Sequence, residues 1–187
     1  MRKLSLRQQL IMVAIFAGSA FVVSFLLALL GSGARHDSGV SPWFVGMTFG
    51  VVTSMIYLGL SANRPAPLAD AAARAQAMAP VPPQMGRLLV VREGFVGKLA
   101  GVDVQVDGSV RAQLRSPRFA AFDLPPGQHR VQATLPNRES EPLVVELPAG
   151  EVAAVRIVIG MGKPRLEREA DIAGLQQRLP GIPMVAA

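Results

Sequence analysis

The stretch LIMVAIFAGSAFVVSFLLALL (residues 10–30), followed after a polar gap by WFVGMTFGVVTSMIYLGLSA (residues 43–62), decides the fold of this chain. Neither run contains a charged residue. At a rise of about 1.5 Å per residue, a run of this length reaches about 30 Å, the thickness of a bilayer's hydrocarbon core. Because lipid offers no partner for backbone N–H and C=O groups, each run is predicted to be helical. Together they predict a transmembrane helical hairpin.

Two other interpretations of these runs stay open. They fit a pair of buried core helices, although uncharged runs of this length are rare in soluble domains. The first run also fits a cleaved signal peptide because a basic segment precedes it, but it is longer than the usual signal core and a second run follows at once. The sequence has no cysteine, which excludes a lipid-modified cysteine, disulfides and thiolate metal sites.

The basic residues around the two runs indicate how the hairpin is oriented. Arg2, Lys3 and Arg7 lie in the tail at residues 1–9, and Arg64 and Arg74 follow the second run. The loop at residues 31–42 has only Arg35, which Asp37 balances. Basic residues concentrate on the cytoplasmic side of membrane spans. We therefore predict a two-pass protein of a bacterial inner membrane with both termini in the cytoplasm. The bias after the second run is slight, so a C-terminal domain on the periplasmic side is the alternative.

Small residues recur at helical spacing on both runs. Gly46, Gly50 and Ser54 share one face of the second run, and Ala14 and Gly18 form a shorter face on the first. Small side chains let helix backbones approach closely, which is how membrane helices gain packing energy. We expect these faces either to pack the hairpin on itself or to mediate self-association of several hairpins.

Residues 63–86 are rich in proline and alanine. Prolines cluster at both ends, and the alanine-rich middle, residues 68–78, is long enough for a short helix. Proline-rich flanks stay extended. The segment is therefore predicted to be a semi-rigid spacer between the membrane and the next domain.

From residue 87 the apolar pattern changes to a period of two, as in Val102, Val104 and Val106, and Asp107-Gly108 supplies a hairpin turn. About seven short strands are predicted, at residues 87–93, 102–106, 110–114, 118–124, 128–135, 142–147 and 151–159. Their spacing favours an antiparallel β-sandwich at residues 87–168 over a parallel sheet with helical crossovers.

The tail, residues 169–187, is predicted to begin with a short amphipathic helix. Ile172, Leu175 and Leu179 have the spacing of one helical face, and Pro180 and Gly181 end it.

Three motifs in order, DLPPGQHRV (123–131), SEPLVVELPAGEVAAVRIVIGMG (140–162) and KPRLERE (163–169), resemble a bacterial domain family of unknown function that often occurs in small envelope lipoproteins. The L-P-P-G turn is more distantly similar to PEGA-type and carboxypeptidase-regulatory-type sandwiches. The resemblance covers about residues 87–180. It implies a small β-sandwich with no assigned activity. This chain departs from the lipoprotein members because it has a hairpin in place of the lipid-bearing cysteine.

The sequence offers no persuasive catalytic or metal-binding constellation. Under the predicted topology His36 and His129 lie on opposite sides of the membrane, so His129 is expected to pack or hydrogen-bond within the domain. Asp103 and Asp107 share a strand face, where solvated charges are the usual case, and Asp107 also has a role in the turn. The GMGK segment at residues 160–163 lacks the spacing of a phosphate-binding loop. We therefore predict no enzyme activity, cofactor or metal.

The net charge is +6, but residues 87–187 carry thirteen Lys/Arg against eleven Asp/Glu, so the basic balance reflects membrane topology rather than nucleic-acid binding. Arg111, Arg115 and Arg118 form the densest basic group and could contact anionic lipid headgroups or a partner. The alternative is a scattered, solvated face. The expected partners are membrane lipid and another protein, or a second copy of the chain through the helices.

These features predict a non-enzymatic, membrane-anchored interaction or scaffold protein that presents a small β-sandwich. The alternative is an envelope-facing module that binds a cell-wall polymer or another envelope component, which requires the domain to lie outside. A hydrolase with an unrecognised site is the third, less favoured hypothesis.

Overall fold

The computed structural model describes residues 6–31, 41–61, 63–136, 138–160 and 162–186. The chain divides into two compact units, residues 1–62 and 63–187. Several residues used in the sequence predictions lie outside the described ranges: Arg2, Lys3, Arg35, His36 and Asp37. The predicted orientation of the chain therefore stays a prediction.

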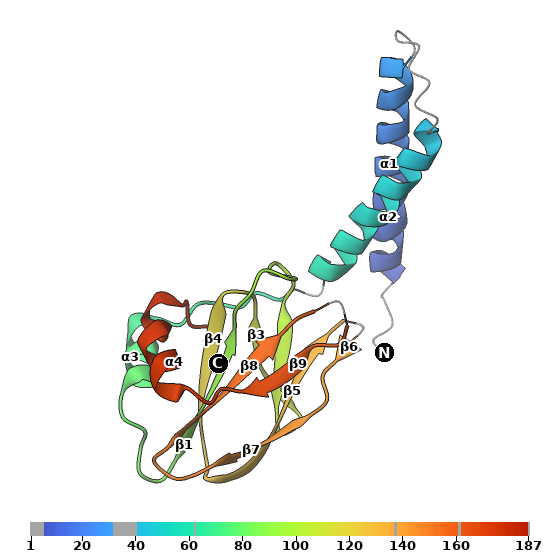
Figure 1. The fold of residues 1–187 in the computed structure, drawn as a ribbon. Coiled ribbons are helices and arrows are strands. Elements are labelled where there is room, and N and C mark those ends of the chain that lie inside the picture. Colours follow the sequence, from blue (N-terminus) through green and yellow to red (C-terminus); the bar gives the residue numbers. More distant parts are fainter. Residues whose placement is uncertain (1–5, 32–40, 62, 137, 161, 187) are drawn as a thin grey trace. The chain divides into compact units, whose positions relative to one another are not determined.

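The first unit is a pair of helices packed against each other, α1 (Leu6–Gly31) and α2 (Pro42–Ser61) (Figure 1). The bounds match the predicted runs, except that α1 begins earlier, at Leu6. Pro42 is the first residue of α2, where a missing backbone N–H costs no helical hydrogen bond. Between the helices the Ser19 and Thr53 hydroxyls lie 2.8 Å apart and form a hydrogen bond. The predicted hairpin is thus confirmed as a packed helix pair.

The second unit contains nine β-strands in its described residues. They are β1 (Gly86–Arg92), β2 (Val102–Val106), β3 (Ser109–Leu114), β4 (Arg118–Leu124), β5 (Gly127–Leu135), β6 (Arg138–Glu139), β7 (Leu143–Leu147), β8 (Val152–Val158) and β9 (Arg165–Arg168). Seven of them coincide with the predicted strands. The other two, β6 and β9, are only two and four residues long, too short to show a period-two pattern.

The strands form two sheets, with the orders β4-β1-β8-β9 and β3-β2-β5-β6, and β7 also pairs with β5. Every strand pair is antiparallel except β1 with β8, which is parallel. The prediction of a wholly antiparallel sandwich is therefore wrong at this pair. The chain between β1 and β8 passes through the whole second sheet, so the parallel pair needs no helical crossover.

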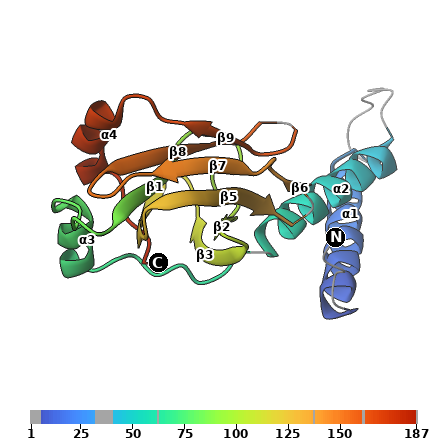
Figure 2. The same ribbon diagram turned by 90° about the horizontal axis from the view of Figure 1, so that it is seen from below.

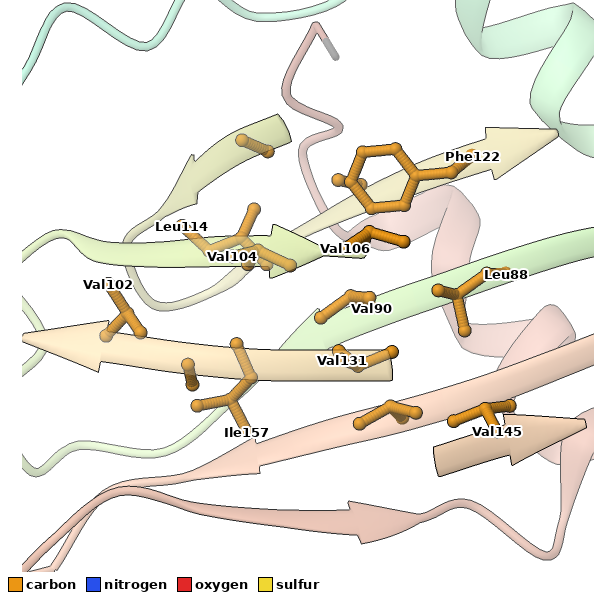
Figure 3. Close-up of a cluster of buried hydrophobic side chains, with 14 of the residues drawn as sticks. Leu88, Val90, Val102, Val104, Val106, Leu114, Phe122, Val131, Val145 and Ile157 are labelled. Atoms are coloured by element: carbon orange, nitrogen blue, oxygen red, sulfur yellow. The ribbon is translucent and has the colours of Figure 1, made fainter. Parts of the chain in front are cut away.

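The two sheets enclose a hydrophobic core. Along β2 the inward side chains of Val102, Val104 and Val106 are at most 3% exposed, while Asp103 and Gln105 between them are half-buried. Figure 3 labels side chains of both sheets that share this core: Leu88, Val90, Val102, Val104, Val106, Leu114, Phe122, Val131, Val145 and Ile157. Each fully buried side chain of this kind stabilises the fold by about 1.5–3 kcal/mol.

A layer of short helices covers the other face of the sheet that contains β1, which is why all seven β1 residues are buried. The layer consists of α3 (Ala71–Met78), α4 (Ile172–Arg178) and the 3₁₀ helix η1 (Leu179–Gly181), and α3 and α4 lie together at one side of β1 (Figures 1 and 2). Leu175 and Leu179 are fully buried against Leu89 and Val91. The predicted C-terminal amphipathic helix is confirmed.

Residues 63–69, which we call the strap, are hydrogen-bonded to the second unit. The Arg64 N–H donates to Gln113 Oε1 (2.7 Å), and the Ala69 N–H donates to the Met184 carbonyl (2.9 Å). The second unit therefore begins at Asn63 and not at residue 87. Proline and alanine content indicates stiffness but cannot show that a segment docks, so these contacts were not part of the predicted spacer.

The C-terminal segment completes the sheet edge at β4. The Val185 N–H donates to the Phe119 carbonyl (2.8 Å), and the Phe119 N–H donates to the Pro183 carbonyl (3.1 Å). A further bridge joins Leu68 of the strap to Val185. The two ends of the unit thus cover an edge strand that would otherwise present unpaired backbone groups.

Candidate functional site

The small residues of α2 face α1. A Cβ added at Gly46 would overlap the Ser24 side chain and the Ala20 carbonyl, and one at Gly50 would lie 2.9 Å from Phe16. Ser54, on the same face of α2, is 9% exposed. This face therefore packs the helix pair on itself, which is one of the two roles expected for it.

The small residues predicted on α1 lie elsewhere. Ala14 and Gly18 are exposed, and a Cβ added at Gly18 would meet no atom within 4 Å. The side of α1 that meets α2 carries Phe16, Ala20 and Ser24. Ala14 and Gly18 therefore lie outside the contact with α2, and the alternative role expected for them, self-association of several hairpins, stays a prediction.

The large apolar side chains of both helices point away from the pair. On α1 they include Phe21, Phe25 and Leu29, and on α2 they include Trp43, Phe44 and Met55, all more than half exposed. Within residues 9–30 of α1 the most apolar stretch of 18 residues is only 6% buried, whereas a soluble core helix is mostly buried. By length and composition α1 fits a membrane span or a signal sequence, and the apolar part of α2, Pro42–Tyr57, is shorter.

The predicted basic group is divided by the fold. Arg111 lies on β3 near the Asp107 turn, where its charge helps to lower the pKa of Asp107. The guanidinium of Arg115 donates to the Arg64 carbonyl (3.5 Å) and that of Arg118 donates to the Ala66 carbonyl (3.4 Å), so both contact the strap. The role of the three arginines in contacting lipid or a partner stays a prediction.

His129 joins two turns of the sandwich. Its Nδ1 lies 2.7 Å from Asp107 Oδ2 in the β2–β3 turn, and its Nε2 lies 2.8 Å from the Pro125 carbonyl in the β4–β5 turn. Both neighbours are acceptors, so both ring nitrogens carry protons in the favoured state. His129 is a buried hydrogen-bonding residue, as predicted.

The two members of this pair shift each other's pKa. Burial alone lowers the pKa of His129, but the hydrogen bonds to Asp107 and Pro125 and the Asp107 charge outweigh it and raise the pKa above 6.5. The hydrogen bond from His129 and the Arg130 backbone N–H lower the pKa of Asp107 below 3.8. The arrangement is an ion pair that fixes two turns.

A shallow depression of about 300 Å³ lies beside this pair, lined by Gln105, Asp107, Gly108, Arg130 and Gln132. The Gln105 amide donates to Thr134 (3.1 Å) and the Gln132 amide donates to the Ser140 carbonyl (3.1 Å). Most of its polar groups are therefore engaged with neighbours. No cluster of three metal-ligating side chains exists among the described residues. Asp103 bonds to Arg64 and Gln113, not to Asp107.

The residue that sequence reasoning missed is Arg92, the last residue of β1. It is 1% exposed, and its guanidinium donates to the carbonyls of Gly97 (2.6 Å), Ala100 (2.5 Å) and Leu114 (2.8 Å). Burial lowers the pKa of Arg92 to about 10, so the side chain stays charged at neutral pH. Two of its three acceptors belong to residues 93–100, which we call the β1–β2 loop.

The β1–β2 loop, EGFVGKLA, exposes three large apolar side chains. Phe95 is 86% exposed, Leu99 67% and Val96 55%. The sequence signal was available: apolar residues in a turn segment, next to the glycines that mark it, have no strand or helix face to occupy.

No protein-family model matches the sequence, and no curated protein matches it. The resemblance to a domain family of envelope lipoproteins therefore stays a prediction. In the structure its DLPPGQHRV motif forms the end of β4, the turn and the start of β5, with Gly127 at φ +140°. The class that fold and surface define is a β-sandwich protein with an apolar N-terminal helix pair.

Proposed function

We propose that this chain is a non-enzymatic, membrane-anchored protein that presents its β unit to a partner as an interaction or scaffold module. The observation that supports this most directly is the apolar outer surface of the helix pair. Small and hydroxyl side chains lie between the helices, and phenylalanine, leucine, tryptophan and methionine side chains lie outside. This inverted arrangement suits lipid as the solvent.

In this proposal both helices cross the bilayer. The 20 residues of α2 reach about 30 Å at 1.5 Å per residue, although its apolar core is shorter than that of α1. Packing against α1 through Gly46 and Gly50 supports a paired insertion. Both termini then lie on the cytoplasmic side, as the basic residues favour.

The side chains of the β unit support a binding role over catalysis. The His129–Asp107 pair is engaged with two turns, and apart from Asp107 the residues that line the nearby depression carry no nucleophilic side chain. The second candidate, a module that binds a cell-wall polymer, is favoured by that same depression, since Arg130 is among its lining residues and its guanidinium can donate to a hydroxyl-rich chain. It requires the β unit to face the periplasm.

The absence of cysteine makes the membrane topology directly measurable. In otherwise unchanged chains, Ser38→Cys places a thiol between the helices and Ser109→Cys places one on an exposed turn of the β unit. Spheroplasts treated with a membrane-impermeant maleimide should label position 38 at once and position 109 only after permeabilisation, and the chain should stay in the membrane pellet after carbonate washing.

Other labelling patterns select the alternatives. Labelling of position 109 but not position 38 in intact spheroplasts would move the β unit to the periplasm and favour the polymer-binding module. Labelling of both positions together with a shortened, soluble chain would make α1 a signal sequence and refute membrane anchoring. Labelling of both in a full-length membrane protein would refute the two-pass hairpin.

A further inference from the structure

The β1–β2 loop carries the most exposed large apolar side chain in the described part of the chain, Phe95. Val96 and Leu99 lie within four residues of it and are also more than half exposed. In the described remainder of the β unit, exposed large apolar side chains occur singly, as with Val110 and Val144. A local group of three at one loop is the pattern of an interaction surface.

Hydrogen bonds from buried side chains fix the backbone of the loop. The buried guanidinium of Arg92 donates to the Gly97 and Ala100 carbonyls, and Ser116 Oγ donates to the Gly94 carbonyl (2.6 Å). Gly94 and Gly97 have φ values of +111° and +63°, which other residues rarely adopt. The apolar side chains therefore face solvent because the backbone is fixed that way.

The base of the loop is bound to the strap through Asn63. The Asn63 amide donates to the Leu99 carbonyl (2.9 Å), and its Oδ1 accepts the Gly101 N–H (2.5 Å). Asn63 is two residues beyond Ser61, the end of α2, and two peptide units reach about 7 Å. Chain length alone therefore keeps the base of the loop within reach of any surface at which α2 ends.

The charges around the loop are cationic or already balanced. Lys98 is exposed at its tip, and the Arg115 guanidinium contacts a backbone carbonyl. The two neighbouring acids are paired, Glu93 with Arg178 (3.0 Å) and Asp103 with Arg64 (3.3 Å). An apolar tip with basic neighbours complements a bilayer that contains anionic lipid.

We propose that the β1–β2 loop is a bilayer-docking loop that inserts Phe95, Val96 and Leu99 into the headgroup region of an anionic membrane. The inference rests on the proposed membrane anchoring and adds that the β unit contacts lipid beside its anchor. A protein partner would use the apolar tip equally well. The short tether and the basic neighbours favour lipid as the occupant.

The test uses the full-length chain reconstituted into vesicles of phosphatidylcholine with phosphatidylglycerol. Because the chain has no cysteine, Phe95→Cys, Ser109→Cys and Val22→Cys can each carry one environment-sensitive fluorophore. Position 95 should show blue-shifted emission and lose most of its fluorescence to nitroxide-labelled lipid. Position 109, on the turn at the opposite end of β2, should stay unshifted and unquenched.

Position 22, an exposed residue of α1, reports on the anchor separately. Quenching at position 22 but not at position 95 would refute docking and leave the anchor intact. Quenching at neither position would refute the anchor itself. A blue shift at position 95 without nitroxide quenching would assign the loop to protein, either a second copy or the helix pair, and would overturn the lipid assignment.

A separate experiment tests the contribution of charge to docking. The fluorophore is moved to position 96 (Val96→Cys), and Lys98 is then varied. Lys98→Glu should reduce quenching at position 96 in anionic vesicles, and Arg130→Glu, exposed beside the Asp107 turn at the opposite end of β2, should not. Equal quenching in the Lys98→Glu chain and in vesicles of phosphatidylcholine alone would refute the electrostatic part of the proposal.

Discussion

The helix pair and the β unit arrange their apolar side chains in opposite ways. In the helix pair, glycine and serine lie at the contact, as at Gly46 and Ser24, while Phe21 and Trp43 are exposed. In the β unit, valine and leucine fill two cores and most charged side chains lie at the surface, with Arg87 and Arg92 as buried exceptions. One chain thus carries two kinds of packing, and under the proposed membrane anchoring each suits a different solvent.

The β1–β2 loop is the point at which the β unit departs from its own pattern. Its apolar side chains face outward, as those of the helices do, and a buried arginine holds its backbone. The buried apolar residues of the β unit stabilise its fold, whereas the exposed apolar residues of the loop and of the helices belong to no core and are available to contact their surroundings.

The largest effect is expected from changing the bounds of the β unit, because they decide whether a fragment folds in water. A fragment of residues 63–187 should be a dispersed monomer without detergent and should unfold cooperatively, because it retains both cores. A fragment of residues 87–168, the bounds predicted from sequence, should fail to fold, since it uncovers Leu89, Val91 and Phe119. Size-exclusion chromatography and thermal unfolding by circular dichroism measure both outcomes.

Cooperative unfolding of the shorter fragment at an unchanged temperature would show that the strap and helices are dispensable. Aggregation of the longer fragment without detergent would show that the β unit depends on the membrane or on the helix pair.

A smaller effect is expected from Arg92→Leu in the full-length chain. The substitution keeps the site filled but leaves the Gly97, Ala100 and Leu114 carbonyls without their donor, which should cost about 2–4 kcal/mol of unfolding free energy. Urea unfolding measures the loss. The exposed Arg165→Leu should change stability by less than about 0.5 kcal/mol. Equal effects of the two substitutions would mean that Arg92 does not hold the loop.

The sequence was sufficient for features whose cause is local. Period-two alternation located seven strands, and the spacing of Ile172, Leu175 and Leu179 located α4. It was insufficient where the cause is a distant partner. The strap is positioned by hydrogen bonds to Gln113 and Met184, and β1 pairs with β8, which lies far along the chain. Neither feature therefore has a local signature in the sequence.

The candidate site shows the same division. Turn chemistry identified Asp107 and its strand identified His129, but their contact depends on the pairing of β2 with β5 in one sheet. In the sequence, Arg92 is the charged residue at the end of an apolar strand. Only the structure shows that its buried guanidinium donates hydrogen bonds to the β1–β2 loop. Arg111, Arg115 and Arg118 are close in sequence, but only the structure shows that Arg115 and Arg118 bond to carbonyls of the strap.

The smallest expected effect is the pH dependence from His129 and Asp107. The raised pKa of His129 gives a contribution that is complete below pH 6.5 and is lost as pH rises through the raised value. The lowered pKa of Asp107 gives a contribution present above pH 3.8 and lost as pH falls through the lowered value. The pair therefore stabilises most between these limits, by less than about 1 kcal/mol because Asp107 is half exposed.

Urea unfolding of the native chain and of His129→Gln at pH 5.5 and pH 9 measures this contribution, with Asp107→Asn as the matched variant. The stability difference between native and variant chains should shrink at the higher pH, because neutral His129 loses its charge and one of the two N–H donors that bond to Asp107 and Pro125. A difference that is constant with pH would make His129 a packing residue whose protonation is irrelevant. The two turns would then be held together without a contribution from charge, as the two helices are by close packing at Gly46.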